Sequence, residues 1–401
     1  MHRTCLVALS MASTLLCTIN GIHAEPPTSH LGSEFVDAWQ GATVRPLTDI
    51  PNRHTMHSYY VCNPESPDGT RVVYYTSTAA NGHVGNVCVL DRATGKETVI
   101  ATDVHTEDAH RAACQQWVSG GRRVAWHEHR NGRWFVMVSD ATNPQPKVVA
   151  ENRQLAFGQG SGDLLPMYGC HWNPGDYRNL ELANVETGEI RTTATAKAMQ
   201  AKYAPWLHKE FGDKPTSIFF PVLSPDLKRV FLKVAAGNGG DNFMSKGASQ
   251  RQGLLVYDFE KADFVYMREK WGHPAWHPDS RQIIEMGNIL INSDSGQTTR
   301  ITNEPNLRGS HPSVSPDGKI FVTDGLSGIE GSPQSEWAVM VGDLKGTYWH
   351  MIHRFDNTHG AKSWRVSHPH PSFSADGNRI YFNVSAGEFT QMHVAEKAAR
   401  K

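Results

Sequence analysis

The stretch His311-Pro-Ser-Val-Ser-Pro-Asp-Gly318 recurs along the chain with small changes and decides the fold. Close copies are Cys62-Asn-Pro-Glu-Ser-Pro-Asp-Gly69 and His370-Pro-Ser-Phe-Ser-Ala-Asp-Gly377. More degenerate copies lie at 114–121, 220–226 and 273–279. Repeats roughly 40 to 50 residues apart, each built of short strands and turns, are typical of a β-propeller. We therefore predict an all-β propeller in which the residue four places before the serine is equivalent in every blade.

A chain of 401 residues is long enough for one closed propeller. Turn sequences such as Asp91-Arg-Ala-Thr-Gly95 mark the ends of further strands. We predict seven blades, at about 57–100, 104–150, 155–195, 216–266, 270–303, 308–354 and 364–396. Residues 44–48 should add a strand to the last blade and close the ring, which removes exposed sheet edges. Residues 196–215 should be helical, and 237–249 a long loop.

The composition excludes some partners and suggests a compartment. The chain has 39 Lys and Arg against 40 Asp and Glu, so no general field would hold nucleic acid or an anionic membrane. We expect neither as a partner, and a monomer or small homo-oligomer. Residues 1–24 resemble a secretory signal peptide, with His2-Arg3, an apolar run over 5–16 and Ala24 at a plausible cleavage site. The propeller should occupy 25–401 of a periplasmic or secreted protein.

Four cysteines remain after this segment: Cys62, Cys88, Cys114 and Cys170. Cys62 and Cys114 occupy matching positions in neighbouring blades. An oxidising compartment permits a disulfide between them. Buried free thiols are the alternative.

Histidines occupy the equivalent position in three consecutive blades, as His273, His311 and His370. His368 lies two residues before His370, so both side chains leave the same face of one strand. His311, His368 and His370 could converge on the channel and hold a divalent metal such as manganese, zinc or calcium. The alternative is structural, with these histidines hydrogen-bonding loop carbonyls.

The segment Trp364-Arg-Val-Ser-His-Pro-His-Pro-Ser-Phe373 resembles the last-blade motif of the oligogalacturonate lyases, which are seven-bladed propellers. The resemblance implies that His368 and His370 coordinate a divalent metal, usually manganese, and that His311 is a third ligand. One position departs from the family, because Arg365 stands where an amide ligand is expected. A guanidinium cannot donate a lone pair, so the metal would have one ligand fewer or Arg365 would hold an anion.

The same resemblance implies catalytic roles in the two preceding blades. His273, in Gly272-His-Pro274, matches the family's catalytic base. Arg251, which precedes a strand late in the fourth blade, matches its catalytic arginine.

A second resemblance is to the propeller ulvan lyases, which use histidine, tyrosine and arginine from earlier blades. The matching candidates are His110, Tyr168 and Arg178. A structural interpretation is also open for them, with Tyr168 as packing and Arg178 in a surface ion pair.

Both families cleave uronate-containing glycans by β-elimination, and the residue types suit that reaction. Arginine or a metal can neutralise the uronate carboxylate, and a neutral histidine can then remove the C5 proton. We predict an anionic uronate oligo- or polysaccharide as substrate, with His273 as base and Arg251 as carboxylate partner. The competing assignment uses His110 and Tyr168 for proton transfer and Arg178 for charge. A third hypothesis is a non-catalytic, TolB-like binding propeller, which needs no converging histidines.

Overall fold

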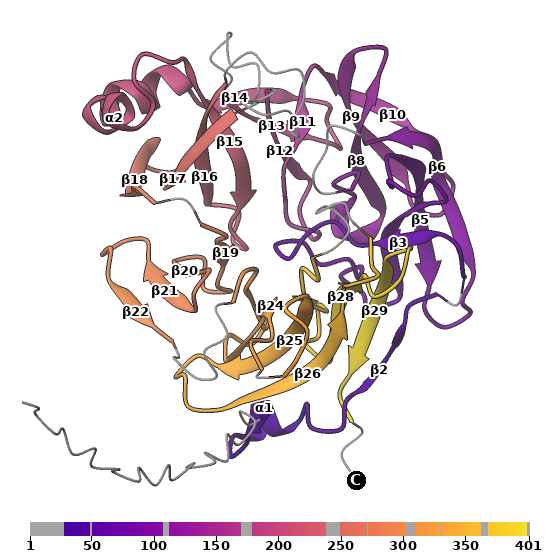
Figure 1. Cartoon of the computed structure of the whole chain (residues 1–401). Helices are drawn as coiled ribbons and strands as arrows, with labels where there is room; N and C mark the ends of the chain where they lie inside the picture. Colours follow the sequence, from indigo (N-terminus) through magenta and orange to yellow (C-terminus); the bar gives the residue numbers. More distant parts are fainter. Residues whose placement is uncertain are drawn as a thin grey trace, which may run out of the picture.

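The computed structural model describes residues 28–48, 50–106, 112–169, 179–237, 249–270, 272–301, 309–329, 331–361 and 368–398. Its strands form seven small antiparallel sheets arranged as a ring (Figure 1). The predicted seven-bladed β-propeller is therefore confirmed.

The first four blades follow the predicted order. Blade 1 contains β3 (His54–Met56), β4 (Arg71–Ser77), β5 (Val84–Asp91) and β6 (Glu97–His105). Blade 2 contains β7 (Gln116–Val118), β8 (Arg123–Arg130), β9 (Arg133–Asp140) and β10 (Lys147–Glu151). Blade 3 contains β11 (Gln154–Leu155), β12 (Leu164–Tyr168), β13 (Leu180–Asn184) and β14 (Ile190–Ala194). Blade 4 contains β15 (Thr216–Leu223), β16 (Arg229–Gly237), β17 (Ser249–Asp258) and β18 (Asp263–Arg268).

The last three blades carry the histidine repeats. Blade 5 contains β19 (Ala275–Trp276), β20 (Gln282–Glu285), β21 (Ile289–Asn292) and β22 (Thr298–Arg300). Blade 6 contains β23 (Ser313–Val314), β24 (Ile320–Leu326), β25 (Glu336–Asp343) and β26 (Trp349–Asp356). Blade 7 contains β27 (Ser372–Phe373), β28 (Arg379–Val384) and β29 (Gln391–Glu396). The first strands of these neighbouring blades contact each other, β19 with β23 and β23 with β27.

Segments from the amino-terminal side complete the last two blades. β2 (Thr43–Pro46) pairs with β29, as predicted for 44–48, and closes the ring. β1 (Ser29–His30) adds a fifth strand to blade 6 by pairing with β26, which the sequence analysis did not anticipate. The short helix α1 (Glu34–Asp37) lies between β1 and β2 in the chain.

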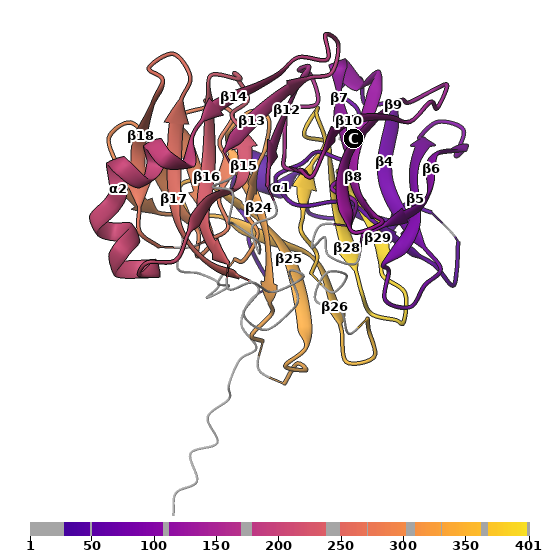
Figure 2. The ribbon, with the colours of Figure 1, turned by 90° about the horizontal axis from the view of Figure 1, so that it is seen from above.

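The predicted helix is α2 (Ala196–Phe211). Thr195 caps it by accepting a hydrogen bond from the Ala198 amide at 3.0 Å. The helix lies on the outer side of the ring, across the molecule from β5 and β6 (Figures 1 and 2). Among the described residues, no helix is both long and apolar enough to cross a membrane.

The repeated turn has a local chemical cause. Ser315 donates its hydroxyl to the Asp317 carboxylate at 2.6 Å and accepts the Ile320 amide at 3.2 Å. Gly318 takes a φ of +70°, which glycine adopts without strain. The turns that begin at Ser66, Ser224 and Ser374 repeat the serine–aspartate bond. Each turn aligns the first strand of its blade with the second.

A buried ion pair joins the first and last blades near these turns. Both oxygens of the fully buried Glu65 carboxylate accept hydrogen bonds at 2.8 Å from the Arg379 guanidinium. The Tyr381 hydroxyl also donates to Glu65. We call Glu65, Arg379 and Tyr381 the closure cluster, because they connect the two blades at which the ring closes.

The cysteines are not cross-linked in the described part of the chain. Cys62, Cys88 and Cys114 are buried free thiols, which decides the open question in favour of that alternative. Burial raises the pKa of the Cys88 thiol to about 12, so it is unreactive at neutral pH. Cys170 lies outside the described residues.

Candidate active site and metal centre

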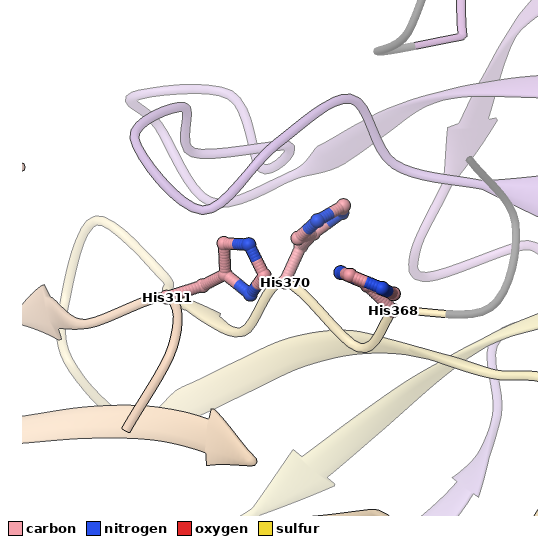
Figure 3. A group of neighbouring side chains, drawn as sticks. All are labelled: His311, His368 and His370. Atoms are coloured by element: carbon pink, nitrogen blue, oxygen red, sulfur yellow. The ribbon is translucent and has the colours of Figure 1, made fainter. Parts of the chain in front are cut away.

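The histidines of the repeat converge at one end of the channel. Ring centroids lie 4.4 Å apart for His311 and His370, 5.3 Å for His311 and His368, and 5.5 Å for His368 and His370. One nitrogen from each of the three lies within 4.8 Å of the others. Figure 3 shows the three imidazoles gathered on one side of the segments that carry them. His273 joins this group, with its ring centroid 4.5 Å from that of His311.

Burial lowers the pKa of His273, His368 and His370, which favours their neutral forms. It lowers the pKa of His368 to about 4, with a further contribution from His311. Burial, followed by the charges of neighbouring histidines, holds the pKa of His370 well below its ordinary value. His370 Nε2 is buried and has no hydrogen-bond partner among the described residues. A buried nitrogen of this kind costs free energy unless something binds it, so the group suits a cation that accepts imidazole ligands.

A buried carboxylate lies behind the histidines. Asp324, on β24, is fully buried, and its two oxygens lie 2.9 and 3.0 Å from His311 Nδ1. The same carboxylate accepts the backbone amides of His311 at 3.0 Å and of His370 at 2.9 Å. The sequence analysis missed this residue, although a charged side chain within the apolar strand Ile320-Phe-Val-Thr-Asp324 could have drawn attention to it.

The backbone of His370 is in an unusual conformation. Its φ is +50°, close to the values of the equivalent Cys114 (+53°) and Phe220 (+54°). Residues other than glycine adopt this region only at a cost, so the surroundings must hold it. Here Asp324 accepts the His370 N–H, and a ring nitrogen of His57 contacts the His370 carbonyl.

The peptide that precedes His273 is held from both sides. The buried Lys233 ammonium donates to the Gly272 carbonyl, and the His273 amide donates to the buried Glu285 carboxylate. Burial raises the pKa of Glu285, and the charge of Lys233 opposes that rise. A Cβ on Gly272 would collide with the Glu285 carboxylate, so a larger residue there would displace that side chain. Burial, then the charges of His311 and Lys233, hold the pKa of His273 well below its ordinary value.

Aromatic side chains also pack against these histidines. The Tyr59 ring lies edge-on to His370, with centroids 4.6 Å apart, and stacks on Phe157 at 6.1 Å. The Tyr60 hydroxyl donates to the Pro274 carbonyl at 3.0 Å. Tyr60 also lines a cavity of about 320 Å³, together with Trp276 and Ser374. This cavity lies toward the ends of the inner strands that are opposite to the histidines. Tyr60 thus lies between the histidines and that cavity.

The remaining sequence candidates are placed differently. Arg251, on β17, lies with its guanidinium 5.8 Å from the centroid of the Phe219 ring. Tyr168 is fully buried in the hydrophobic core and meets the same ring edge-on at 5.6 Å. His110, Arg178 and Arg365 lie outside the described residues.

Comparisons with known proteins identify the class of fold. An oligogalacturonate lyase solved in complex with manganese is 16% identical, with a TM-score of 0.61 over 89% of this chain and 94% of that chain. The oligogalacturonate lyase of Vibrio parahaemolyticus is 15% identical, with a TM-score of 0.59 over 92% of this chain and 96% of that one.

Propellers with other names also match. The Swd1 β-propeller domain of Myceliophteria thermophila is 9% identical, with a TM-score of 0.52 over 87% of this chain and 100% of that domain. No protein-family model matches the sequence, and the search of curated proteins gives no match. The chain therefore has the seven-bladed fold of the oligogalacturonate lyases, and the predicted resemblance is confirmed at that level. The ulvan-lyase resemblance stays a prediction.

Proposed function

We propose that this protein cleaves uronate-containing glycans by β-elimination, in the manner of an oligogalacturonate lyase. The observation that carries the proposal is the group of four histidines, buried or half-buried, that meet before the inner strands of blades 5 to 7. A binding propeller that uses its repeats only as scaffold has no need of such a group. The two lyases that share the fold support the same choice.

A divalent metal is part of the proposal. His311, His368 and His370 would hold it, and the metal would withdraw charge from the uronate carboxylate and so acidify the C5 proton. Three imidazole nitrogens suit zinc, whereas calcium prefers oxygen ligands, so this donor set favours zinc over calcium. Manganese stays a candidate because an oligogalacturonate lyase that shares the fold was solved in complex with it.

His273 would remove the proton. Its imidazole is neutral at neutral pH, and the proton from C5 goes to a ring nitrogen. The electron pair of the C5–H bond forms the double bond between C4 and C5, while the C4–O4 bond breaks and the departing oxygen takes up a proton. A bound uronate brings negative charge close to His273, which favours the imidazolium that forms. Arg251 would bind the carboxylate of the substrate.

The clamped peptide gives His273 a fixed position for this step. Lys233 and Glu285 hold the Gly272–His273 peptide at its carbonyl and its amide. A base held in one geometry reacts faster than one that must be ordered in each turnover.

The test is incubation with a panel of uronate glycans, including galacturonan fragments and ulvan, followed by ultraviolet absorbance of the unsaturated product. Galacturonan activity supports the assignment to His273. A preference for ulvan favours His110, Tyr168 and Arg178 instead. If the protein binds one of the glycans but releases no product from any of them, the hypothesis of a non-catalytic binding propeller is favoured.

We also propose, from the first 24 residues, that the protein is exported to the periplasm or secreted. Mass spectrometry of the protein recovered from each cell fraction tests this. A mature chain that begins near residue 25 outside the cytoplasm is the expected result.

A further inference from the structure

We infer that Asp324 is a positioning residue for the metal site: it fixes the tautomer of His311 and joins the two blades that supply the ligands. The inference rests on the proposed metal site, and it concerns a side chain that touches neither metal nor substrate. Asp324 contacts two of the three candidate ligands, His311 through ring and backbone and His370 through its backbone.

The first step concerns protons. The Asp324 carboxylate already accepts two backbone N–H groups, one from each blade. Its remaining acceptor capacity faces His311 Nδ1 at 2.9 and 3.0 Å. A carboxylate only accepts, so Nδ1 must carry the proton. The lone pair of His311 is then on Nε2, the nitrogen that remains for a metal.

The second step concerns geometry. Asp324 belongs to β24 of blade 6, whereas His370 precedes β27 of blade 7. The bond from the His370 amide to Asp324 therefore crosses from one blade to the next, and its donor is the residue with a φ of +50°. Without this bond, the backbone of His370 loses one of the two contacts that hold its conformation. Its side chain would then turn relative to His311.

An amide at position 324 would disturb both functions. Asparagine has nearly the same shape as aspartate but offers one oxygen and one NH₂ group. In either orientation, the NH₂ group would face an N–H that the carboxylate now accepts. Where the NH₂ group faces His311 Nδ1, the ring can accept from it only by moving its own proton to Nε2, which removes the lone pair needed by the metal.

Blade 7 offers a matched control. Asn383 on β28 lies opposite His370, just as Asp324 on β24 lies opposite His311, by extension of the two strand registers. Asn383 Oδ1 accepts the backbone amide of His57, in the neighbouring blade 1, at 3.2 Å. Asn383 thus makes the same kind of inter-blade bond as Asp324, but it binds a backbone amide of His57 and no ring of the three candidate ligands.

The experiment is a titration of metal-free full-length protein with Mn²⁺ and, separately, Zn²⁺, by calorimetry. We expect Asp324→Asn to weaken binding about 10- to 100-fold, the range typical of residues that orient metal ligands. Asn383→Ala, which reaches His370 only through His57, should weaken binding far less than Asp324→Asn does, even if it is less stable. Nitrogen NMR of histidine-labelled, metal-free protein should show the Nδ1–H tautomer for His311 in the wild type and the Nε2–H tautomer in Asp324→Asn.

The outcomes separate the two proposals. If the wild type binds metal and Asp324→Asn binds it within about twofold, the positioning role is wrong while the metal site stands. If the wild type binds neither ion, the metal site is wrong and this inference with it. An equal loss of affinity in Asp324→Asn and Asn383→Ala would show that only the contact between blades matters. Asp324→Ala is the second variant, should the asparagine protein not fold.

Discussion

The two ends of the short inner strands in blades 5 to 7 use the same kinds of residue for different purposes. At one end, each repeat turn pairs its polar groups within itself, as Ser315 does with Asp317, and the closure cluster pairs its charges in the same way. At the other end lie buried imidazoles and a left-handed His370. A fully paired polar group stabilises the fold, whereas a buried nitrogen without a partner is a cost that a bound cation removes. This contrast separates the closing of the ring from the candidate chemistry.

The largest expected effect comes from β19, which has a histidine near each end. His273→Ala should lower kcat/KM for the preferred uronate glycan by about 10²- to 10⁴-fold, because a general base contributes that much. His277→Ala is the matched control: its ring contacts the Gly318 carbonyl at 3.3 Å and accepts the Asp279 amide at 3.2 Å. This control should lose about 1 kcal/mol of stability and keep its activity.

The measurement is initial rate against glycan concentration for both variants, with urea unfolding in parallel. Full activity in His273→Ala would refute the assignment of the base. An equal loss of activity in the two variants would mean that the two ends of the inner strands do not differ in function.

In the closure cluster, a substitution should lower stability and leave activity unchanged. Arg379→Ala leaves the buried Glu65 carboxylate with Tyr381 and with Arg92, whose guanidinium lies 3.7 Å away. Because a buried charge loses its bidentate partner, we expect the free energy of unfolding to fall by about 3 kcal/mol. The control is Arg45→Ala, whose side chain is 52% exposed beside Glu396, with an expected loss of about 0–1 kcal/mol.

Urea unfolding monitored by tryptophan fluorescence gives both stabilities. The folded fraction of Arg379→Ala should still turn over the glycan at the wild-type rate and bind the same amount of metal. A variant that is stable but inactive would contradict the separation of the two ends.

Removal of metal should destabilise the fold, and this effect should depend on the candidate ligands and not on histidines at the other end of the inner strands. A ligand present at about 100 times its dissociation constant stabilises a protein by about 2.7 kcal/mol, so a chelator should lower the Tm by several degrees. His368→Ala should have a low Tm from the start and no response to chelator, whereas His277→Ala should respond as the wild type does. Differential scanning calorimetry with and without chelator measures this. An unchanged wild-type Tm in protein shown to contain metal would mean that the ion lies elsewhere.

The repeat made the fold and much of the site predictable. It marks the inner strand of each blade, so the blade count, the closing strand and the convergence of His273, His311 and His370 all follow from spacing. It carries no information about the second strand of a blade. Asp324, Lys233 and Glu285 therefore escaped notice, since their roles depend on which backbone group the register brings opposite them. β1 escaped because a two-residue strand has no periodicity.

The smallest expected effect concerns a half-buried histidine that belongs to neither end of the inner strands. His353, on β26, stacks with His393 of blade 7 at a centroid distance of 5.9 Å. Burial first, and then the charge of His393, lower its pKa from 6.5 to about 4. The unfolded chain therefore binds more protons between these values, so His353 contributes stability that is complete above pH 6.5 and is lost as the pH falls toward 4.

His353→Leu should therefore flatten the fall in unfolding free energy between pH 6.5 and 4 while leaving the pH profile of kcat/KM unchanged. His208→Leu is the control, since that side chain is already 74% exposed in the folded protein and should leave the slope as it is. Urea unfolding at successive pH values, in chelator so that metal release does not contribute, gives the slopes. If His353→Leu also shifted the pH profile of kcat/KM, the fall in activity at low pH would reflect unfolding of the protein. The contrast between the two strand ends would then need a measurement at a pH where every variant is fully folded.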